Sequence, residues 1–233
     1  MRELTQDYIR QLATIDTPTI SNAIEEFGLR CPTTGFMGPE VKSLFPELGV
    51  MMGYAVTATA HTTTSNVQRE ICIHELLQAI HDSPKPAVLI LKSEGIQPIR
   101  TCVIGELIVL SMRKFGAIGV VTDGCIRDIQ QVRKAGFHAF AAGSVVSHGL
   151  PSLCRINAPV EISDVKIEPG DLIHGDENGI LKIPWECAGR LVGVARKILD
   201  TEKAIIKSLQ TQRLTPDEAT QLLRHSEEPN SEC

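Results

Sequence analysis

Short apolar runs alternate with segments of helical periodicity in this sequence, and this alternation restricts the fold more than any other feature. Strands are indicated by period-two or continuous apolar runs, and helices by apolar side chains three and four residues apart. The predicted elements are, in chain order, a strand at 53–60, a helix at 67–82, a buried strand at 86–92, a helix at about 104–115, a strand at 117–122, a helix at about 126–134 and a strand at 137–142. Strands joined by helices predict parallel β-α-β units.

The sequence after residue 158 has a different pattern, in which strand-like runs follow one another closely. PVEI and VKIE flank Ser163-Asp164, and Asn178-Gly179 separates two further strand-like runs as a hairpin signal. These runs leave no room for a crossover helix between them. We therefore predict an α/β fold with a mixed sheet and a β-hairpin side, rather than a purely parallel sheet.

Helix signals lie near both ends of the chain. Thr17 is the predicted N-cap of a helix that has Pro18 at its first position and that Gly28 closes. A long amphipathic helix is expected from about 185 to 210, and TPDE at 215–218 is a capping box that begins one more short helix.

Length and composition restrict the class of protein. The 233 residues suit one compact domain, assigned to 1–210, followed by a short helix and a disordered tail over 211–233. The net charge of −5, from 23 basic and 28 acidic residues without long runs of either sign, predicts neither a nucleic-acid nor an anionic-membrane partner. The polar N-terminus and the lack of a run of about 18 apolar residues predict a cytoplasmic protein. Seven cysteines without a CxxC pair are interpreted as reduced thiols, mostly buried.

The strongest candidate site is the segment TDGCIRD at 122–128, where an apolar strand ends in a Gly-containing turn that opens a helix. Open α/β sheets bind ligands outside the carboxyl ends of their strands. Arg127 offers a planar set of donors suited to a carboxylate, and Asp128 offers a hard oxygen ligand suited to Mg²⁺ or Mn²⁺. A neighbouring anion site and cation site suit a 2-oxo acid. The alternative is that both are solvated first-turn residues, with Asp128 favoured by the helix dipole.

A second candidate is Gly105-Glu106-Leu107, at another passage from strand to helix. Free backbone N–H groups at a helix start can hold an anion, and Glu106 can reach a metal or its water. The alternative is that Glu106 is an ordinary acid at a helix start.

Three further signals are interpreted as structural. His74-Glu75 lacks the second histidine of a zinc-protease helix because Gln78 stands there, and Ser147-His148 has no G-x-S-x-G sequence around it and is interpreted as a loop. Lys92 ends an apolar strand and is interpreted as a solvated strand-end lysine; it also defines a competing mechanism, a metal-free aldolase that forms an imine.

Three ordered motifs resemble the family that contains 4-hydroxy-4-methyl-2-oxoglutarate aldolase and the regulator of ribonuclease activity A. They are GEL at 105–107, GVVTDGCIRD at 119–128 and PGDLIHGDENGILKIP at 169–184. The resemblance extends over roughly 180 residues. It implies a swivelling β/β/α fold with a long C-terminal helix, assembled as a homotrimer or a dimer of trimers (a homohexamer), with active sites at subunit interfaces.

The resemblance also implies roles for individual residues. Asp128 corresponds to the acid that binds the metal, Arg127 to the residue that holds the pyruvyl group, and Glu106 to the acid that contacts metal-bound water. The backbone amides from Gly105 through Leu107 to Ile108 would receive the pyruvyl carboxylate, and Glu202 of a neighbouring subunit would complete the water shell.

The function that follows is a divalent-metal-dependent class II aldolase that cleaves a 4-hydroxy-2-oxo diacid to pyruvate and also decarboxylates oxaloacetate. The alternative is a non-catalytic oligomeric regulator that binds a ribonuclease or another protein. Retention of Asp128 and Glu106 favours the enzyme. The sequence departs from the family pattern at 92–100, which replaces a short link rich in acids and glycines, and at Asn22, where an Asp is expected.

Overall fold

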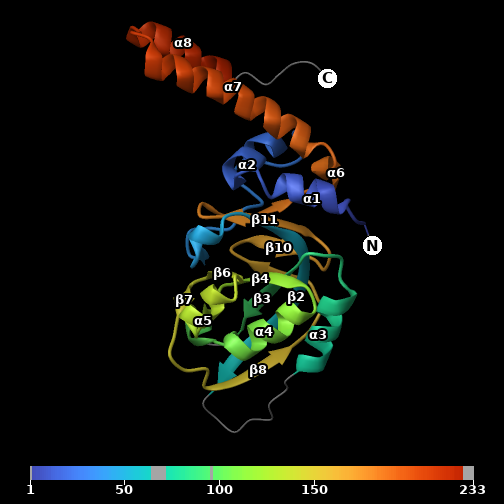
Figure 1. Ribbon diagram of the computed structural model, residues 1–233. Helices are drawn as coiled ribbons and strands as arrows, with labels where there is room; N and C mark the ends of the chain where they lie inside the picture. Colours follow the sequence, from blue (N-terminus) through green and yellow to red (C-terminus); the bar gives the residue numbers. More distant parts are fainter. Residues whose placement is uncertain (1, 64–71, 95–96, 228–233) are drawn as a thin grey trace.

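The computed structural model describes residues 2–63, 72–94 and 97–227, and a mixed β-sheet forms its centre (Figure 1). The strands are β1 (Lys42–Ser43), β2 (Met51–Thr63), β3 (Ala87–Ser93), β4 (Ala117–Thr122), β5 (Cys125–Ile126), β6 (His138–Ala141), β7 (Gly143–Ser144), β8 (Leu150–Cys154), β9 (Val160–Ile162), β10 (Val165–Ile167), β11 (Leu172–Asp176) and β12 (Gly179–Ile183). The helices are α1 (Gln6–Leu12), α2 (Thr17–Glu25), α3 (Ile73–Asp82), α4 (Glu106–Lys114), α5 (Ile129–Lys134), α6 (Trp185–Ala188), α7 (Leu191–Thr211) and α8 (Pro216–Glu227), with two short 3-10 helices, η1 (Pro46–Leu48) and η2 (Pro98–Arg100).

The central sheet has eight strands in the order β1-β6-β4-β3-β2-β11-β12, and β8 pairs with the end of β2. Strands β2, β3, β4 and β6 are parallel, while β1, β8, β11 and β12 are antiparallel to their neighbours. The predicted parallel β-α-β units and the predicted mixed sheet with a hairpin side are both confirmed.

Apolar side chains cover both faces of the sheet because successive strand residues point to opposite sides. Leu89 of β3 packs in the cluster that contains Val109 of α4, whereas the next residue, Ile90, packs against Val160 of the β9-β10 hairpin. A third cluster joins α1, α2, α6 and α7 to β2, β11 and β12. Helices on one face and a β-hairpin on the other give the β/β/α layering that the family resemblance implies.

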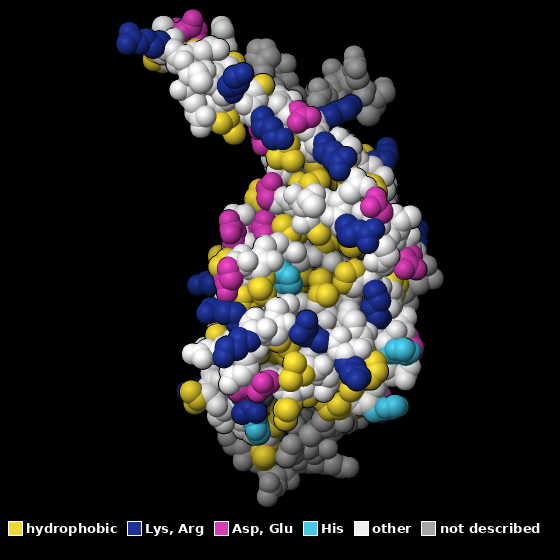
Figure 2. All heavy atoms as spheres, viewed as in Figure 1, with side chains coloured by type: hydrophobic (Ala, Val, Ile, Leu, Met, Phe, Trp, Pro, Cys, Tyr) yellow, Lys and Arg dark blue, Asp and Glu magenta, His cyan; other side chains and the backbone are white. Residues whose placement is uncertain are grey.

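The C-terminal helices α7 and α8 project from the body beyond α1 and α2, whereas α4 and α5 lie on the body (Figure 1). Basic, acidic and apolar side chains are interspersed on the face seen in Figure 2, and apolar side chains also show on the projecting helices. Among the latter, Ile206 is 50% exposed, Leu209 43% and Leu223 51%. Of the helices in the described part of the chain, none has the length and apolar character needed to cross a membrane.

Two helix starts differ from the prediction. Asp16, not Thr17, is the N-cap of α2, and its Oδ1 accepts a hydrogen bond from the Thr19 amide at 2.9 Å. Both residue types cap helices, so the sequence did not separate them. The helix expected from about 126 begins at Ile129, because residues 125–126 pair with β7 as the short strand β5.

Two C-terminal elements are also corrected. The helix expected from about 185 to 210 is interrupted at Gly189 and divided into α6 and α7. The β11-β12 turn consists of Glu177-Asn178, since Gly179 already pairs with Asp176. The capping box at 215–218 is confirmed by hydrogen bonds in both directions between Thr215 and Glu218. Two predictions fall partly outside the described residues. The start of the helix expected at 67–82 lies in the segment 64–71, and the end of the expected tail lies at 228–233.

Candidate active site

Two segments that are separate in the sequence meet at the N-terminus of α4. The Arg127 amide donates to the Ile104 carbonyl at 3.0 Å, and Ile104 and Ile126 form a parallel bridge. Gly105, the N-cap of α4, therefore lies against the segment that carries Arg127 and Asp128. The fold thus brings together the two motifs that the sequence singled out.

Asp128 is held in an orientation that its own helix does not explain. Its backbone is left-handed, with φ 58° and ψ 43°, a conformation that Asp tolerates better than most residues. It is the N-cap of α5, yet its side chain makes no capping bond there; instead Oδ2 accepts a hydrogen bond from the Glu106 amide at 3.0 Å. The carboxylate therefore lies at the N-terminus of α4, where unpaired amides and the helix dipole stabilise negative charge.

Gly105 makes this close approach possible. A Cβ atom at position 105 would lie 2.7 Å from Asp128 Oδ2 and 3.0 Å from Arg127 Nε. Both distances are shorter than ordinary van der Waals contacts, so any side chain would displace the acid or the guanidinium. Because the Gly105 backbone is extended, at φ −146°, space rather than conformation requires glycine here.

Arg127 and Asp128 lie at a cavity of about 250 Å³. Arg127 Nε is 3.8 Å from Asp128 Oδ2, and the two side chains are 38% and 33% exposed, so ligands can reach both. The walls are formed by Ile73, Val103, Gly105, Leu107, Ile108, Arg127, Asp128, His148, Pro151, Ser152 and Leu153. The cavity thus combines the guanidinium of Arg127, the carboxylate of Asp128 and the N-terminus of α4 with walls that are mostly apolar. Such a lining suits a small organic anion.

The predicted anion-binding amides differ in their availability. The Glu106 amide is already bonded to Asp128, and Glu106 itself is exposed and is not among the residues that line the cavity. The first helical bond runs from the Val109 amide to the Gly105 carbonyl at 3.0 Å. Leu107 and Ile108 do line the cavity, and their amides remain as donors without a partner within the helix.

Glu202 is not brought to this cavity within one chain. It is half-buried on α7, and Figure 1 shows α7 projecting from the end of the molecule that carries α1 and α2, away from α4. Its predicted contribution from a neighbouring subunit remains a prediction.

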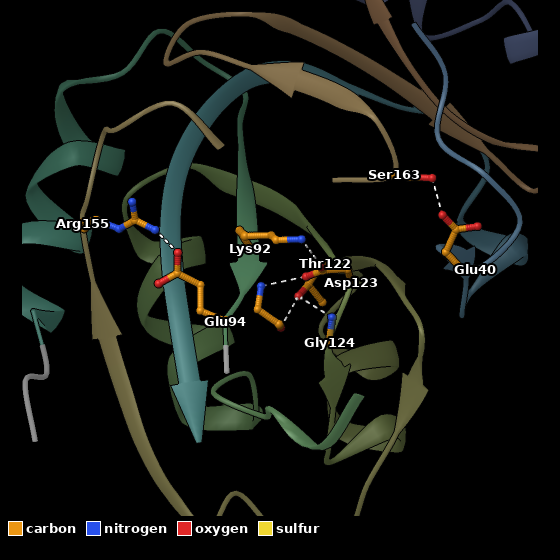
Figure 3. Close-up of polar contacts among 9 residues, drawn as sticks. Glu40, Lys92, Glu94, Thr122, Asp123, Gly124, Arg155 and Ser163 are labelled. Atoms are coloured by element: carbon orange, nitrogen blue, oxygen red, sulfur yellow. Dashed lines mark hydrogen bonds and ion pairs between the residues drawn. The ribbon is translucent and has the colours of Figure 1, made fainter. Parts of the chain in front are cut away.

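Lys92 has a carboxylate partner (Figure 3). Its Nζ donates to Asp123 Oδ2 at 2.6 Å, and the Ser93 amide donates to Asp123 Oδ1 at 2.7 Å. Lys92 is not among the residues that line the cavity. An imine-forming lysine needs a neutral amine that faces its substrate, and an ammonium committed to Asp123 does not provide one. The contacts of Lys92 therefore favour a structural role.

Two cavity residues were missed as site residues because they come from β8 and the loop before it. His148 lies at the cavity, although sequence reasoning interpreted it as part of a loop, and Ser152 is 1% exposed on β8. The Ser152 hydroxyl is buried without a hydrogen-bond partner among the described residues. No local sequence signal indicates either residue, since β8 reaches the site through its antiparallel pairing with β2.

Other histidines and cysteines have structural roles. His174 is buried, its Nδ1 lies 3.0 Å from the Thr17 hydroxyl, and burial lowers its pKa. Cys102 lies behind the site, where burial raises the pKa of its thiol to about 11 despite the opposing effect of Arg127. A thiol with this pKa stays protonated at neutral pH and is a poor nucleophile. Cys125 and Cys187 are also buried, whereas Cys31 is exposed, so burial of the thiols is only partly as expected.

The donor set is compatible with magnesium or manganese. Within the described residues, no group of three or more His, Cys, Asp or Glu side chains is arranged to hold a metal ion. A site with several protein ligands is therefore not formed by these residues alone. Mg²⁺ commonly uses one or two carboxylates and completes its shell with water and substrate oxygens. Asp128, one-third exposed at the cavity, fits that mode.

Fold and site together define an α/β protein with a carboxylate and a guanidinium at the N-terminus of a helix beside a parallel sheet. Comparison with known proteins places it: the chain belongs to the RraA-like family (Aldolase/RraA), whose model matches residues 17–181. The predicted family is thereby confirmed.

Individual relatives differ in how much of each chain is matched. An uncharacterized protein of Methanocaldococcus jannaschii is 37% identical over 106 residues, which are 45% of this chain and 51% of that protein, so the chain spans about half of its length. A protein of Halalkalibacterium halodurans named "Putative 4-hydroxy-4-methyl-2-oxoglutarate aldolase" is 28% identical over 185 residues, 79% of this chain and 80% of that protein. The crystal structure of Streptomyces coelicolor RraAS2, titled an unusual member of the RNase ES inhibitor RraA protein family, has the same fold, with a TM-score of 0.68, 21% identity and coverage of 87% and 97%.

Proposed function

We propose that this protein is a divalent-metal-dependent class II aldolase that cleaves a 4-hydroxy-2-oxo diacid to release pyruvate, and that also decarboxylates oxaloacetate. The observation that carries the proposal is the placement of Asp128 and Arg127 side by side at one cavity, on the N-terminus of α4. The relative named as an aldolase of this substrate class supports the choice of reaction.

Asp128 would hold the metal, Mg²⁺ or Mn²⁺. When bound, such an ion supplies a positive charge that stabilises the negative charge developing on the 2-oxo group. The bond from the Glu106 amide to Oδ2 fixes the carboxylate in one orientation before any ligand arrives. Preorganisation of this kind avoids the cost of ordering the side chain during binding.

Arg127 and the helix amides would bind the pyruvyl part of the substrate. The guanidinium can donate two parallel hydrogen bonds to a carboxylate, which a lysine cannot do. Leu107 and Ile108 line the same cavity and their amides have no partner within α4, so these amides can donate to a carboxylate oxygen. The negative charge of the substrate carboxylate would thus be stabilised by the Arg127 side chain and by the N-terminus of α4.

A proton acceptor and a second subunit complete the proposal. Glu106, or Glu202 from a neighbouring copy, would position the water that takes the proton of the 4-hydroxyl. Self-association as a trimer or a dimer of trimers would bring α7 of one copy toward the cavity of another. The exposed apolar side chains Ile206, Leu209 and Leu223 on the projecting helices suit such an interface.

Pyruvate release tests the proposed function directly. The assay compares 4-hydroxy-4-methyl-2-oxoglutarate, 4-carboxy-4-hydroxy-2-oxoadipate and oxaloacetate for wild type, Asp128→Asn and Asp7→Asn. Asp7 is exposed on α1 and is the matched control. We expect Asp128→Asn to lose at least about 100-fold in kcat/KM and Asp7→Asn to match wild type. Wild type without activity on all three substrates would refute the enzyme.

The second candidate function is a non-catalytic regulator that binds a ribonuclease or another protein. Leu107 and Leu110, one turn apart on α4, are 79% and 48% exposed, and an exposed apolar pair of this kind suits a protein partner. This candidate predicts that Leu107→Glu abolishes inhibition of a ribonuclease while Asp128→Asn leaves it unchanged. Inhibition that is absent from the wild type would exclude this candidate.

A further inference from the structure

We infer that His148 is the general base that removes the proton of the substrate's 4-hydroxyl, an inference that rests on the proposed lyase function. It replaces the carboxylate-positioned water in that step with a side chain of the same cavity. Three observations support this inference: the residues that line the cavity, the hydrogen bond of the His148 ring, and the position of Ser152 on β8.

The lining of the cavity leaves few groups able to accept a proton. Among the described residues that line it, the titratable side chains are Arg127, Asp128 and His148. Arg127 is permanently charged and Asp128 is the proposed metal ligand. Glu106 is not a lining residue, and Glu202 lies on the projecting helix α7. His148 is the remaining proton acceptor within this set.

The hydrogen bonding of His148 favours the tautomer that a base requires. Its Nδ1 lies 2.7 Å from the carbonyl oxygen of Gly149. A carbonyl oxygen only accepts hydrogen bonds, so Nδ1 must carry the proton and donate it. In the neutral ring Nε2 then holds the lone pair that can accept a proton. The backbone thus performs the orienting role that a third residue often has beside a catalytic histidine.

Ser152 is a second polar residue on this wall of the cavity. The residue lines the same cavity, is 1% exposed, and its hydroxyl has no hydrogen-bond partner among the described residues. A buried hydroxyl without a partner is unfavourable, and rotation about a single side-chain bond changes the direction in which it donates. Because the hydroxyl oxygen is itself buried, it meets a ligand oxygen only after the Ser152 side chain rotates toward the cavity. The 4-hydroxyl end of the substrate would then lie toward His148 and Ser152, with the pyruvyl end at Arg127.

The step is balanced in protons and electrons. Nε2 of His148 takes the proton of the 4-hydroxyl, the electron pair of the broken O–H bond becomes the second C4–O bond of a carbonyl, and the C3–C4 bond breaks. The electron pair of that bond passes into the pyruvate enolate, whose C3 is afterwards protonated by the imidazolium to give the methyl group of pyruvate. Oxaloacetate decarboxylation forms the same enolate by loss of carbon dioxide; it has no hydroxyl proton for a base to remove, and its enolate takes the C3 proton from water.

This difference between the two reactions provides the test. His148→Gln should lower kcat for cleavage of 4-hydroxy-4-methyl-2-oxoglutarate by about 100-fold or more, the usual contribution of a general base. Oxaloacetate decarboxylation by the same variant should stay within about threefold of wild type. His81→Gln is the matched control, because His81 is exposed on α3, and it should change neither reaction. In His148→Ala, added imidazole should restore part of the cleavage, because the site of the ring is exposed.

Three results would overturn the inference. Cleavage that survives in His148→Gln would leave a water positioned by Glu106 or Glu202 as the acceptor. Equal losses in cleavage and decarboxylation, without imidazole rescue, would make His148 a structural or substrate-binding residue. A wild-type protein that performs neither reaction would refute the proposed function, and the assignment of His148 would fail with it.

Discussion

Replacement of Gly105 by alanine tests whether the close approach of α4 and Asp128 creates the site. An alanine Cβ would stand 2.7 Å from Asp128 Oδ2 and 3.0 Å from Arg127 Nε, so both groups must move by several tenths of an ångström. The extended backbone of Gly105 accommodates alanine, so the effect comes from displacement and not from conformational strain. The movement weakens the 3.0 Å bond from the Glu106 amide to Oδ2.

A hydrogen bond to a charged group contributes about 1.5–3 kcal/mol. If that contribution is lost from a site that must be preformed, kcat/KM falls by about 10- to 150-fold, at about 1.36 kcal/mol per tenfold. Pyruvate release measures kcat/KM, and titration with Mn²⁺ measures metal affinity, which should fall as well. Gly193→Ala is the control, because Gly193 lies exposed within α7 with open space around it. Gly105→Ala with wild-type kcat/KM and wild-type Mn²⁺ affinity would refute the reasoning.

Three further predictions follow from the same structure. Arg127→Lys should raise KM for the 2-oxo acid more than it lowers kcat, because a point charge does not replace a two-pronged donor; an unchanged KM in steady-state kinetics would contradict this. Asp176→Asn should lower the free energy of unfolding by about 1–3 kcal/mol in urea titrations, because its buried Oδ2 accepts from the Thr17 amide at 2.7 Å; an unchanged midpoint would contradict it. Mixed Asp128→Ala and Glu202→Ala chains should regain activity if Glu202 acts across a subunit interface, and exchanged but inactive mixtures would exclude that role.

Much of the fold follows from apolar patterning in the sequence. The run at 117–122 predicts β4 with its observed bounds because continuous apolar residues indicate a buried strand. The two-residue strand β5 is too short to show any periodicity, so the sequence pattern predicts the following helix three residues early. Where Asp16 and Thr17 stand side by side, both can cap a helix; in the fold the Asp16 side chain accepts from the Thr19 amide, and the Thr17 amide donates to Asp176.

The candidate site is only partly readable from sequence. Arg127 and Asp128 are indicated by residue type at a predicted strand end and by resemblance to the family. The Asp128 side chain does not cap its own helix but accepts a hydrogen bond from the Glu106 amide. This orientation depends on a left-handed backbone at Asp128, which the sequence pattern does not predict. His148 and Ser152 reach the cavity through pairing of β8 with β2, two strands about 90 residues apart. Contacts of this kind depend on the tertiary fold rather than on local spacing.

Metal dependence tests the central claim most directly. Wild-type protein is treated with EDTA, assayed for pyruvate release, and assayed again after addition of excess Mg²⁺ or Mn²⁺, with borohydride trapping of the enzyme and substrate in parallel. We predict that EDTA abolishes turnover, that either ion restores it in wild type but not in Asp128→Asn, and that no adduct forms. Full activity in EDTA together with a trapped adduct on Lys92 would contradict the metal mechanism and establish the imine in its place.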